Sequence, residues 1–233
     1  MSITALRNGL LVVLAMTGLA HADPDRFSFS NNTRYLALGD SLAAGFGALP
    51  ATRGYAYLLY QKGVYDRELN TSFANAAVPG ATSSDVLTYQ VPQAIKIFQP
   101  HVITISVGGN DLLRILRGAD PNQVLGEFAA NLTQILCGLR DGIQGVRVYI
   151  HNLYDIPEIT EGIPGGLQAI LQFNTIVAGI AQSCGAAGVA DVYSAFLGRQ
   201  GLLIIDRNRH EPLEVHPTNA GYRVIADAFE AVH

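Results

Sequence analysis

Four separated positions carry the chemical groups that acyl transfer requires. Ser41 follows the apolar run YLALG, and His216 lies in EVHPTNAGY. Gly80 lies in VPGATSSD and Asn110 in GGND, and both offer nitrogen donors. A hydroxyl can attack an ester carbonyl, an imidazole can accept its proton, and N–H groups can stabilise the oxyanion that forms. The four positions together predict a serine-dependent acyl transfer site.

Each position also has an ordinary structural explanation. Ser41 could be a helix N-cap, and Gly80 and Asn110 could be turn residues. His216 could be a loop histidine ahead of a proline. Their joint occurrence at three successive strand ends and before the last helix favours the chemical interpretation.

The elements that position these residues alternate along the chain. The run VITISV is β-branched without polar alternation, as expected of a strand buried on both faces. We expect strands at Thr33–Leu38, Thr71–Ala76, Val102–Val107, Val146–Ile150 and Gly188–Val192. We expect helices at Tyr55–Val64, Ser84–Phe98 (interrupted at Pro92), Asn122–Leu139, Gly166–Cys184 and Thr218–Val232. This alternation predicts an α/β fold with a parallel sheet covered on both faces, whose strand ends gather reactive groups.

Composition limits the classes of protein to which the chain can belong. Of 233 residues, 49% are apolar and 15% charged, which is typical of a globular chain with a substantial core. The net charge of −4 includes no basic stripe, which argues against nucleic acid or an anionic membrane as a partner. We see no internal repeat and no shift in composition that would mark a second domain.

The N-terminal residues resemble an export signal. Arg7 precedes an apolar run from Gly9 to Ala20, and Ala20-His21-Ala22 is an A-x-A cleavage signature. We therefore expect residues 1–22 to be a signal peptide and residues 23–233 a single domain, secreted or periplasmic in a bacterium. The apolar run is too short for a membrane-spanning helix. A buried N-terminal helix is the alternative.

Cys137 and Cys184 are the only two cysteines. An even number in an exported protein permits one disulfide, which would contribute on the order of 4 kcal/mol in the chain-entropy model. Two buried free thiols are the alternative. Two cysteines without nearby paired histidines do not make a zinc site.

The motifs in this order resemble those of the SGNH/GDSL hydrolase family. LALGDSLAAGFG is similar to the family's first block, NAAVPGATSSD to the second, ISVGGNDLL to the third and HPTNAGYRVIADAF to the last. The resemblance implies a flavodoxin-like three-layer α/β/α sandwich with a five-stranded parallel sheet. It also implies Ser41 as nucleophile, His216 as general base, and Gly80 and Asn110 as the oxyanion hole.

One position departs from the family pattern. The family usually has Asp three residues before the catalytic histidine, where this chain has Leu213. An acid there holds the imidazole in the required tautomer and stabilises the imidazolium. Glu214 is the candidate replacement, and a backbone carbonyl near Leu213 is the alternative. Asp40 and Asp111 are interpreted as helix-start or supporting residues and not as a glycosidase pair.

The resemblance implies a secreted esterase or lipase that cleaves carboxylic esters, such as acyl esters or lysophospholipids, with no metal and no organic cofactor. The apolar segments Leu112–Leu116 and Ile159–Gly166 favour an acyl-chain pocket. A carbohydrate O-acetyl esterase is the alternative enzyme, and a catalytically silent binding module on the same fold is the alternative from another class. The sequence does not indicate the acyl length, the alcohol or the oligomeric state.

Overall fold

The computed structural model describes residues 34–65, 71–204 and 216–233. The predicted signal peptide and Glu214 lie outside these residues. In the described part of the chain, no helix combines the length and the apolar character that a membrane span requires.

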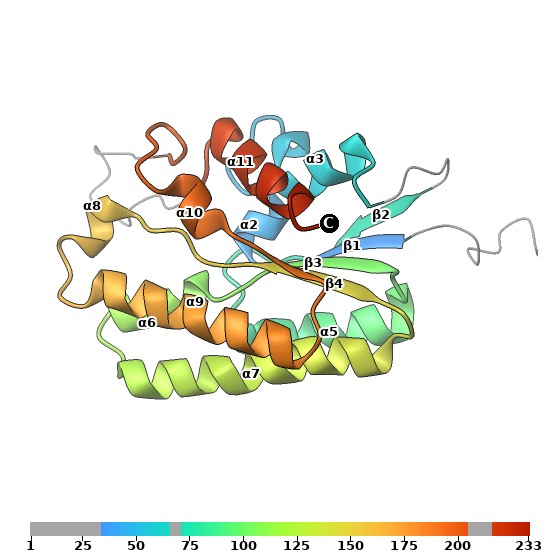
Figure 1. The fold of residues 1–233 in the computed structure, drawn as a ribbon, viewed down its shortest axis with the longest axis horizontal. Coiled ribbons are helices and arrows are strands. Elements are labelled where there is room, and N and C mark those ends of the chain that lie inside the picture. The colour runs from blue at the N-terminus through green and yellow to red at the C-terminus, as the bar shows by residue number, and fades with distance from the viewer. Residues whose placement is uncertain (1–33, 66–70, 205–215) are drawn as a thin grey trace, which may run out of the picture. The chain divides into compact units, whose positions relative to one another are not determined.

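Five parallel strands form one sheet. They are β1 (Arg34–Gly39), β2 (Ser72–Asn75), β3 (Val102–Ser106), β4 (Arg147–His151) and β5 (Gly188–Ala190), in the spatial order β2-β1-β3-β4-β5 (Figure 1). All five predicted strands are present, with ends within two residues of the predicted positions. The strand order is that of the flavodoxin-like doubly wound sheet, so the predicted fold class is confirmed.

Helices cover both faces of this sheet (Figure 1). One face carries α4 (Ser83–Asp85), η4 (Val86–Gln90), α5 (Val91–Gln93), η5 (Ala94–Phe98), α6 (Gly109–Leu116), α7 (Pro121–Gly142) and α9 (Gly166–Ser183). The other face carries α2 (Ser41–Ala44), α3 (Tyr55–Lys62), α10 (Val192–Phe196) and α11 (Asn219–Glu230). The short elements η3 (Ala51–Arg53) and α8 (Pro157–Thr160) lie in connections.

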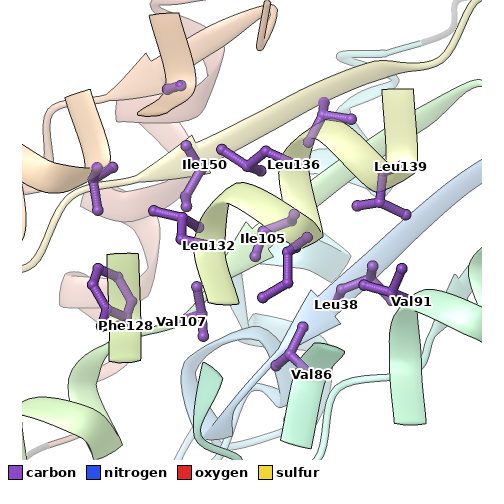
Figure 2. Close-up of a cluster of buried hydrophobic side chains, with 14 of the residues drawn as sticks. Leu38, Val86, Val91, Ile105, Val107, Phe128, Leu132, Leu136, Leu139 and Ile150 are labelled. Carbon is purple, nitrogen blue, oxygen red and sulfur yellow. The ribbon is translucent and has the colours of Figure 1, made fainter. Parts of the chain in front are cut away.

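Alternate residues of each strand supply the two halves of the core. Leu36 and Leu38 of β1 belong to the cluster beneath α7, whereas Tyr35 and Ala37 belong to the cluster beneath α3 and α11. In Figure 2, Ile105 and Ile150 from the sheet lie beside side chains of α7 such as Leu132. Because both faces of the central strands are buried, these strands lack polar alternation in the sequence.

Some helical regions differ from the sequence prediction. Asn110 was predicted to lie on a turn and no helix was predicted there, but residues Gly109–Leu116 form the two-turn helix α6, and the short helix α10 was not predicted either. The predicted interruption at Pro92 instead appears as π-helical turns on both sides of a short α-helical segment. Pro92 has no N–H to continue an α-helical ladder, and wider i→i−5 bonds, such as Val91 N–H to the Val86 carbonyl, keep the chain helical.

A disulfide joins the two cysteines. Cys137 of α7 and Cys184, which follows α9, are bonded, and their Cα atoms are 4.8 Å apart. The bond closes a loop with a sequence separation of 47 and ties together the two long helices on one face. The predicted pairing is therefore present, and the free-thiol alternative is wrong.

Removing this bond should cost stability without altering the site. We expect the double variant Cys137→Ala/Cys184→Ala to lose about 4 kcal/mol of unfolding free energy, because its unfolded chain is no longer cross-linked. Urea denaturation measures the loss, and the unmodified protein assayed with and without reductant is the control. Alkylation of both cysteines in denaturant without prior reduction would contradict the disulfide.

Candidate active site

One pocket brings together three of the four predicted site residues. Ser41, Asn110 and His216 all line a pocket of about 80 Å³. They come from three distant parts of the chain: the start of α2, the first turn of α6 and the residues before α11. Gly80 is not among the lining residues, but it lies in a loop that contacts Asn110 through Ala81.

Ser41 begins α2 directly after β1. The preceding residue, Asp40, caps this helix by accepting a hydrogen bond from the Leu42 N–H at 3.0 Å. Ser106 at the end of β3 donates its hydroxyl to the same Asp40 oxygen at 2.7 Å. Burial raises the pKa of the Asp40 carboxyl to about 6, although both of these hydrogen bonds lower it. Asp40 is thus a helix-start residue, as predicted, and holds the turn that presents Ser41.

The loop around Gly80 is a tight turn. The Ala81 N–H donates to the Val78 carbonyl at 3.0 Å, with Pro79 and Gly80 between them. Gly80 has φ of +86°, and proline followed by a residue of positive φ is the pattern of a type II turn. Glycine adopts this φ without strain. No acceptor in the described part of the chain binds the Gly80 N–H, which leaves it available as a donor.

Asn110 is anchored to that turn by its side chain. Its Nδ2 donates one hydrogen bond to the Ala81 carbonyl at 2.9 Å. A side-chain amide has two N–H groups, so the second can serve another acceptor. Since Asn110 also lines the pocket, the second N–H belongs to an amide already fixed at the pocket wall.

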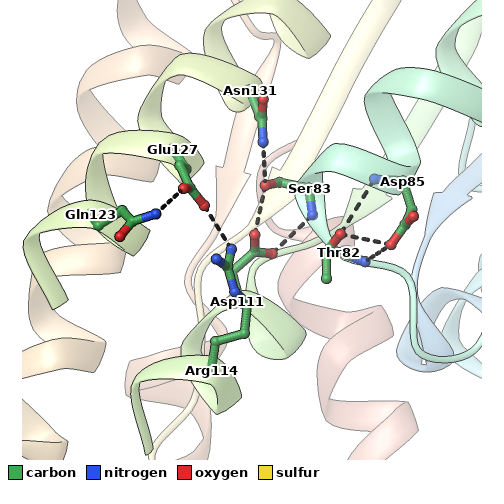
Figure 3. A network of polar contacts seen from close by, with 8 residues as sticks. All are labelled: Thr82, Ser83, Asp85, Asp111, Arg114, Gln123, Glu127 and Asn131. Atoms are coloured by element: carbon green, nitrogen blue, oxygen red, sulfur yellow. Dashed lines mark hydrogen bonds and ion pairs between the residues drawn. The ribbon is translucent and has the colours of Figure 1, made fainter. Parts of the chain in front are cut away.

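A buried carboxylate holds the same two segments together (Figure 3). Asp111 accepts hydrogen bonds from the Ser83 N–H at 2.9 Å and from the Ser83 hydroxyl at 2.7 Å. Asn131 of α7 donates to that hydroxyl at 3.0 Å. Burial raises the pKa of Asp111, whereas the bonds from Ser83 lower it. This network supports the start of α6, and hence Asn110.

His216 lies two residues before Thr218, the N-cap of α11, and is contacted by two other segments. Its carbonyl accepts a hydrogen bond from Ile204 N–H at 2.9 Å, and the next residue, Pro217, forms an antiparallel bridge with Leu203. The Phe46 ring packs against the imidazole, with ring centroids 4.6 Å apart. Tyr222 of α11 fixes Phe46 by donating its hydroxyl to the Phe46 carbonyl at 2.6 Å.

Apart from Asp40 and Thr160, the rest of the pocket is formed by apolar residues. Its walls come from α6, from the chain after β4, and from α8 and α9; the residues are Leu112, Leu113, Leu116, Leu153, Tyr154, Ile156, Thr160 and Ile170. Leu112–Leu116 therefore contributes to the wall as predicted, and Thr160 does so from the predicted segment Ile159–Gly166. The sequence did not predict the contributions of Leu153, Tyr154, Ile156 and Ile170, since no local pattern marks them.

The predicted orienting acid, Glu214, lies outside the described residues, as do its neighbours Glu211 and Asp206. Among the residues that the structure does describe, no group of three or more His, Cys, Asp or Glu side chains is arranged to hold a metal ion.

Comparison with known proteins places this chain in a family. The family model of the GDSL-like lipases and acylhydrolases matches residues 37–224 of the chain. The chain belongs to this family. The solved structure of the lipase Lip_vut3 from a goat rumen metagenome is similar to this GDSL-family chain, with a TM-score of 0.70 and 27% identity, and the match covers 86% of this chain and 97% of that one.

Two curated relatives resemble this GDSL-family chain in sequence. The spore germination lipase LipC of Bacillus licheniformis is 27% identical over 209 residues, which are 85% of this chain and 95% of LipC. The thioesterase 1/protease 1/lysophospholipase L1 of Escherichia coli is 34% identical over 110 residues, which are 45% of this chain. That alignment spans 50% of the E. coli protein, so the chain matches about half the length of that relative.

The position of Asn110 leads to a prediction about rate. If Asn110 donates to the developing oxyanion, Asn110→Ala should lower kcat about 100- to 1000-fold, because that donor is lost. KM should change little, since this hydrogen bond strengthens mainly in the transition state. Steady-state kinetics on a soluble ester measures both quantities.

The matched control is Asn122→Ala, an exposed asparagine in the first turn of α7. Asn110→Ala also leaves the buried Ala81 carbonyl without its donor, so folding is checked by circular dichroism. A folded Asn110→Ala protein with kcat within about twofold of wild type contradicts the assignment.

Proposed function

We propose that this GDSL-family chain hydrolyses carboxylic esters through an acyl-enzyme on Ser41. The observation that carries the proposal is that Ser41, Asn110 and His216 line one pocket whose remaining walls are mostly apolar. The similarity to a lipase and to a thioesterase/lysophospholipase supports an acyl substrate.

The proposed reaction proceeds in two halves. His216 accepts the Ser41 proton while the Ser41 oxygen attacks the ester carbonyl, and the carbonyl oxygen becomes an oxyanion. The Asn110 amide, the Gly80 N–H and the Ser41 N–H stabilise that oxyanion. His216 then returns the proton to the leaving alcohol. Water attacks the acyl-enzyme by the same route and releases the carboxylic acid and free Ser41.

The pocket favours an acyl chain of medium length. Asn110, Leu113 and Leu116 lie on one face of α6 and all line the pocket. At 1.5 Å per residue, the six steps from Asn110 to Leu116 extend about 9 Å, which matches an acyl chain of about eight carbons. An acetyl group would leave this apolar wall in contact with water, so an O-acetyl esterase is the weaker candidate.

A series of p-nitrophenyl esters from acetate to palmitate tests the function. We expect kcat/KM to rise from acetate to a maximum at about eight carbons, because each added methylene buries apolar surface along α6. Ser41→Ala is the matched control and should abolish turnover at every length.

Three results would contradict this account. Absence of turnover by the wild type favours a silent binding module. Preference for acetate and for acetylated xylan favours a carbohydrate O-acetyl esterase. Full turnover by Ser41→Ala excludes Ser41 as the nucleophile.

Glu214 is proposed to orient His216. If its carboxylate binds the ring N–H that faces away from Ser41, Glu214→Gln should lower kcat by orders of magnitude, though less than His216→Ala does. If a backbone carbonyl near Leu213 fulfils this role, Glu214→Gln should leave kcat almost unchanged. Comparison of kcat for wild type, Glu214→Gln and Glu211→Gln distinguishes the two arrangements, with Glu211→Gln as the nearby acidic control.

Export is proposed as well. Residues 1–22 have the composition of a signal peptide, and the Cys137–Cys184 disulfide is of the kind that persists in oxidising compartments. The proposed location is therefore periplasmic or extracellular, with cleavage before Asp23. N-terminal sequencing of the protein recovered from the periplasm or medium tests this site.

A further inference from the structure

A buried amide side chain binds the last residue of β1. Gln90, which ends η4, is 2% exposed. Its Oε1 accepts a hydrogen bond from the Gly39 N–H at 2.7 Å, and its Nε2 donates to the Gly39 carbonyl at 2.8 Å. One primary amide therefore satisfies both backbone groups of a single residue.

This contact completes the hydrogen bonding of β1 where its pairing with β2 ends. The pairing of β2 with β1 ends at Asn75 opposite Ala37, two residues before Gly39. Beyond that point the segment after β2 still donates the Val78 N–H to the Gly39 carbonyl at 3.0 Å, but the Gly39 N–H binds Gln90 Oε1 and not a backbone carbonyl of that segment. The Gln90 amide thus supplies the acceptor that a continuing strand would have supplied, and adds a second donor to the Gly39 carbonyl.

The π-helical turn accounts for a buried glutamine here. In η4 the Val91 N–H donates to the Val86 carbonyl, five residues back, and Pro92 follows with no N–H of its own. A π turn contains one more residue than the α-helical turn, which shifts the side chains after it around the helix axis. Such turns occur often at functional sites.

Gly39 is the junction from which two parts of the site extend. It precedes Asp40 and Ser41, and its carbonyl also accepts the Val78 N–H at 3.0 Å. Val78 is the first residue of the turn that carries Gly80. A shift of the Gly39 peptide would therefore move both the nucleophile and an oxyanion donor.

We infer that Gln90 is a positioning residue for ester hydrolysis, which holds the Gly39 peptide and through it the Ser41 hydroxyl and the Gly80 N–H. The inference rests on the proposed function. Gln90 does not line the pocket, so it acts through Gly39 and not on the substrate.

The decisive variant is Gln90→Glu, which changes one group and keeps the shape. An ionised carboxylate would place a second oxygen against the Gly39 carbonyl, where Nε2 now donates. A protonated carboxyl has an O–H that can donate to that carbonyl and an oxygen that can accept from the Gly39 N–H. The Gln90→Glu variant should therefore turn over substrate when the introduced carboxyl is protonated and lose turnover when it is ionised.

We expect kcat of Gln90→Glu to fall about 100-fold relative to wild type at about pH 8.5, with KM changed little, because the reacting groups are displaced while the acyl walls are not. The ratio of the two kcat values should recover to within about tenfold at about pH 5.5. The ratio cancels the pH dependence of kcat that wild type and variant have in common. A residue that served stability alone would not produce a pH-dependent kcat ratio in folded protein.

Gln90→Met is the second variant, since it fills the same volume without hydrogen bonds or charge. We expect its kcat to fall by about the same factor at both pH values, so it decides the matter if Gln90→Glu unfolds at high pH. Gln93→Glu and Gln93→Met are the matched controls, because Gln93 is exposed on the adjacent segment α5, and both should behave as wild type.

The inference is overturned if the folded Gln90 variants keep kcat within about twofold of wild type. It is also overturned if they raise KM alone, or if the Gln90→Glu ratio does not change with pH. Wild-type turnover is measured first: its absence refutes the proposed function, whereas normal turnover by wild type and variants alike refutes only the role of Gln90.

Discussion

The end of β1 lies against the end of β3 only because residue 39 has no side chain. A Cβ on Gly39 would overlap the Ser106 carbonyl oxygen, and the φ of +126° at this glycine is unfavourable for other residues. The Asp40 N–H donates to that oxygen at 3.0 Å, and the Ser106 hydroxyl returns a hydrogen bond to the Asp40 carboxyl. This reciprocal contact fixes the start of α2 beside the segment that leads into α6, so the positions of Ser41 and Asn110 both depend on it.

The strand order places this contact at the crevice where a doubly wound sheet usually binds its ligand. In the order β2-β1-β3-β4-β5 the chain leaves β1 toward one edge and β3 toward the other, which opens a crevice at their carboxyl ends. Burial in that crevice raises the pKa of the Asp40 carboxyl to about 6, above the usual value of an aspartate. The folded protein therefore binds the proton more tightly than the unfolded chain, and this contribution to the free energy of unfolding is lost as the pH rises through 6.

Much of the fold could be predicted from local sequence. The β-branched run at Val102–Val107 predicts a strand buried on both faces, and the structure has this strand as β3. The motifs that contain Ser41 and Asn110 come directly after predicted strands, so their place at the carboxyl ends of the sheet could be predicted as well. The helix α6 could not be predicted, because Gly108 and Gly109 favour a turn and the helix is secured by non-local contacts such as that of Asp111 with Ser83.

The residues that support the site could not be predicted for the same reason, because their contacts are non-local. Nothing in the sequence assigns a role to Gln90, Ser106 or Phe46, because their contacts form only when the fold brings distant segments together. The pocket wall after β4 is equally non-local. Sequence thus predicts the groups that could react, whereas their mutual alignment depends on hydrogen bonds between segments far apart in the chain.

The central claim is that Ser41 is the nucleophile at a pocket whose oxyanion donors are Asn110 and Gly80. Its most direct test is a crystal structure of the protein after reaction with a fluorophosphonate, since the phosphonyl group mimics the tetrahedral intermediate. We expect phosphorus bonded to the Ser41 Oγ, with one phosphonyl oxygen about 3 Å from both the Asn110 Nδ2 and the Gly80 nitrogen. A phosphonyl oxygen directed away from both donors, or attachment to another residue, would contradict the account.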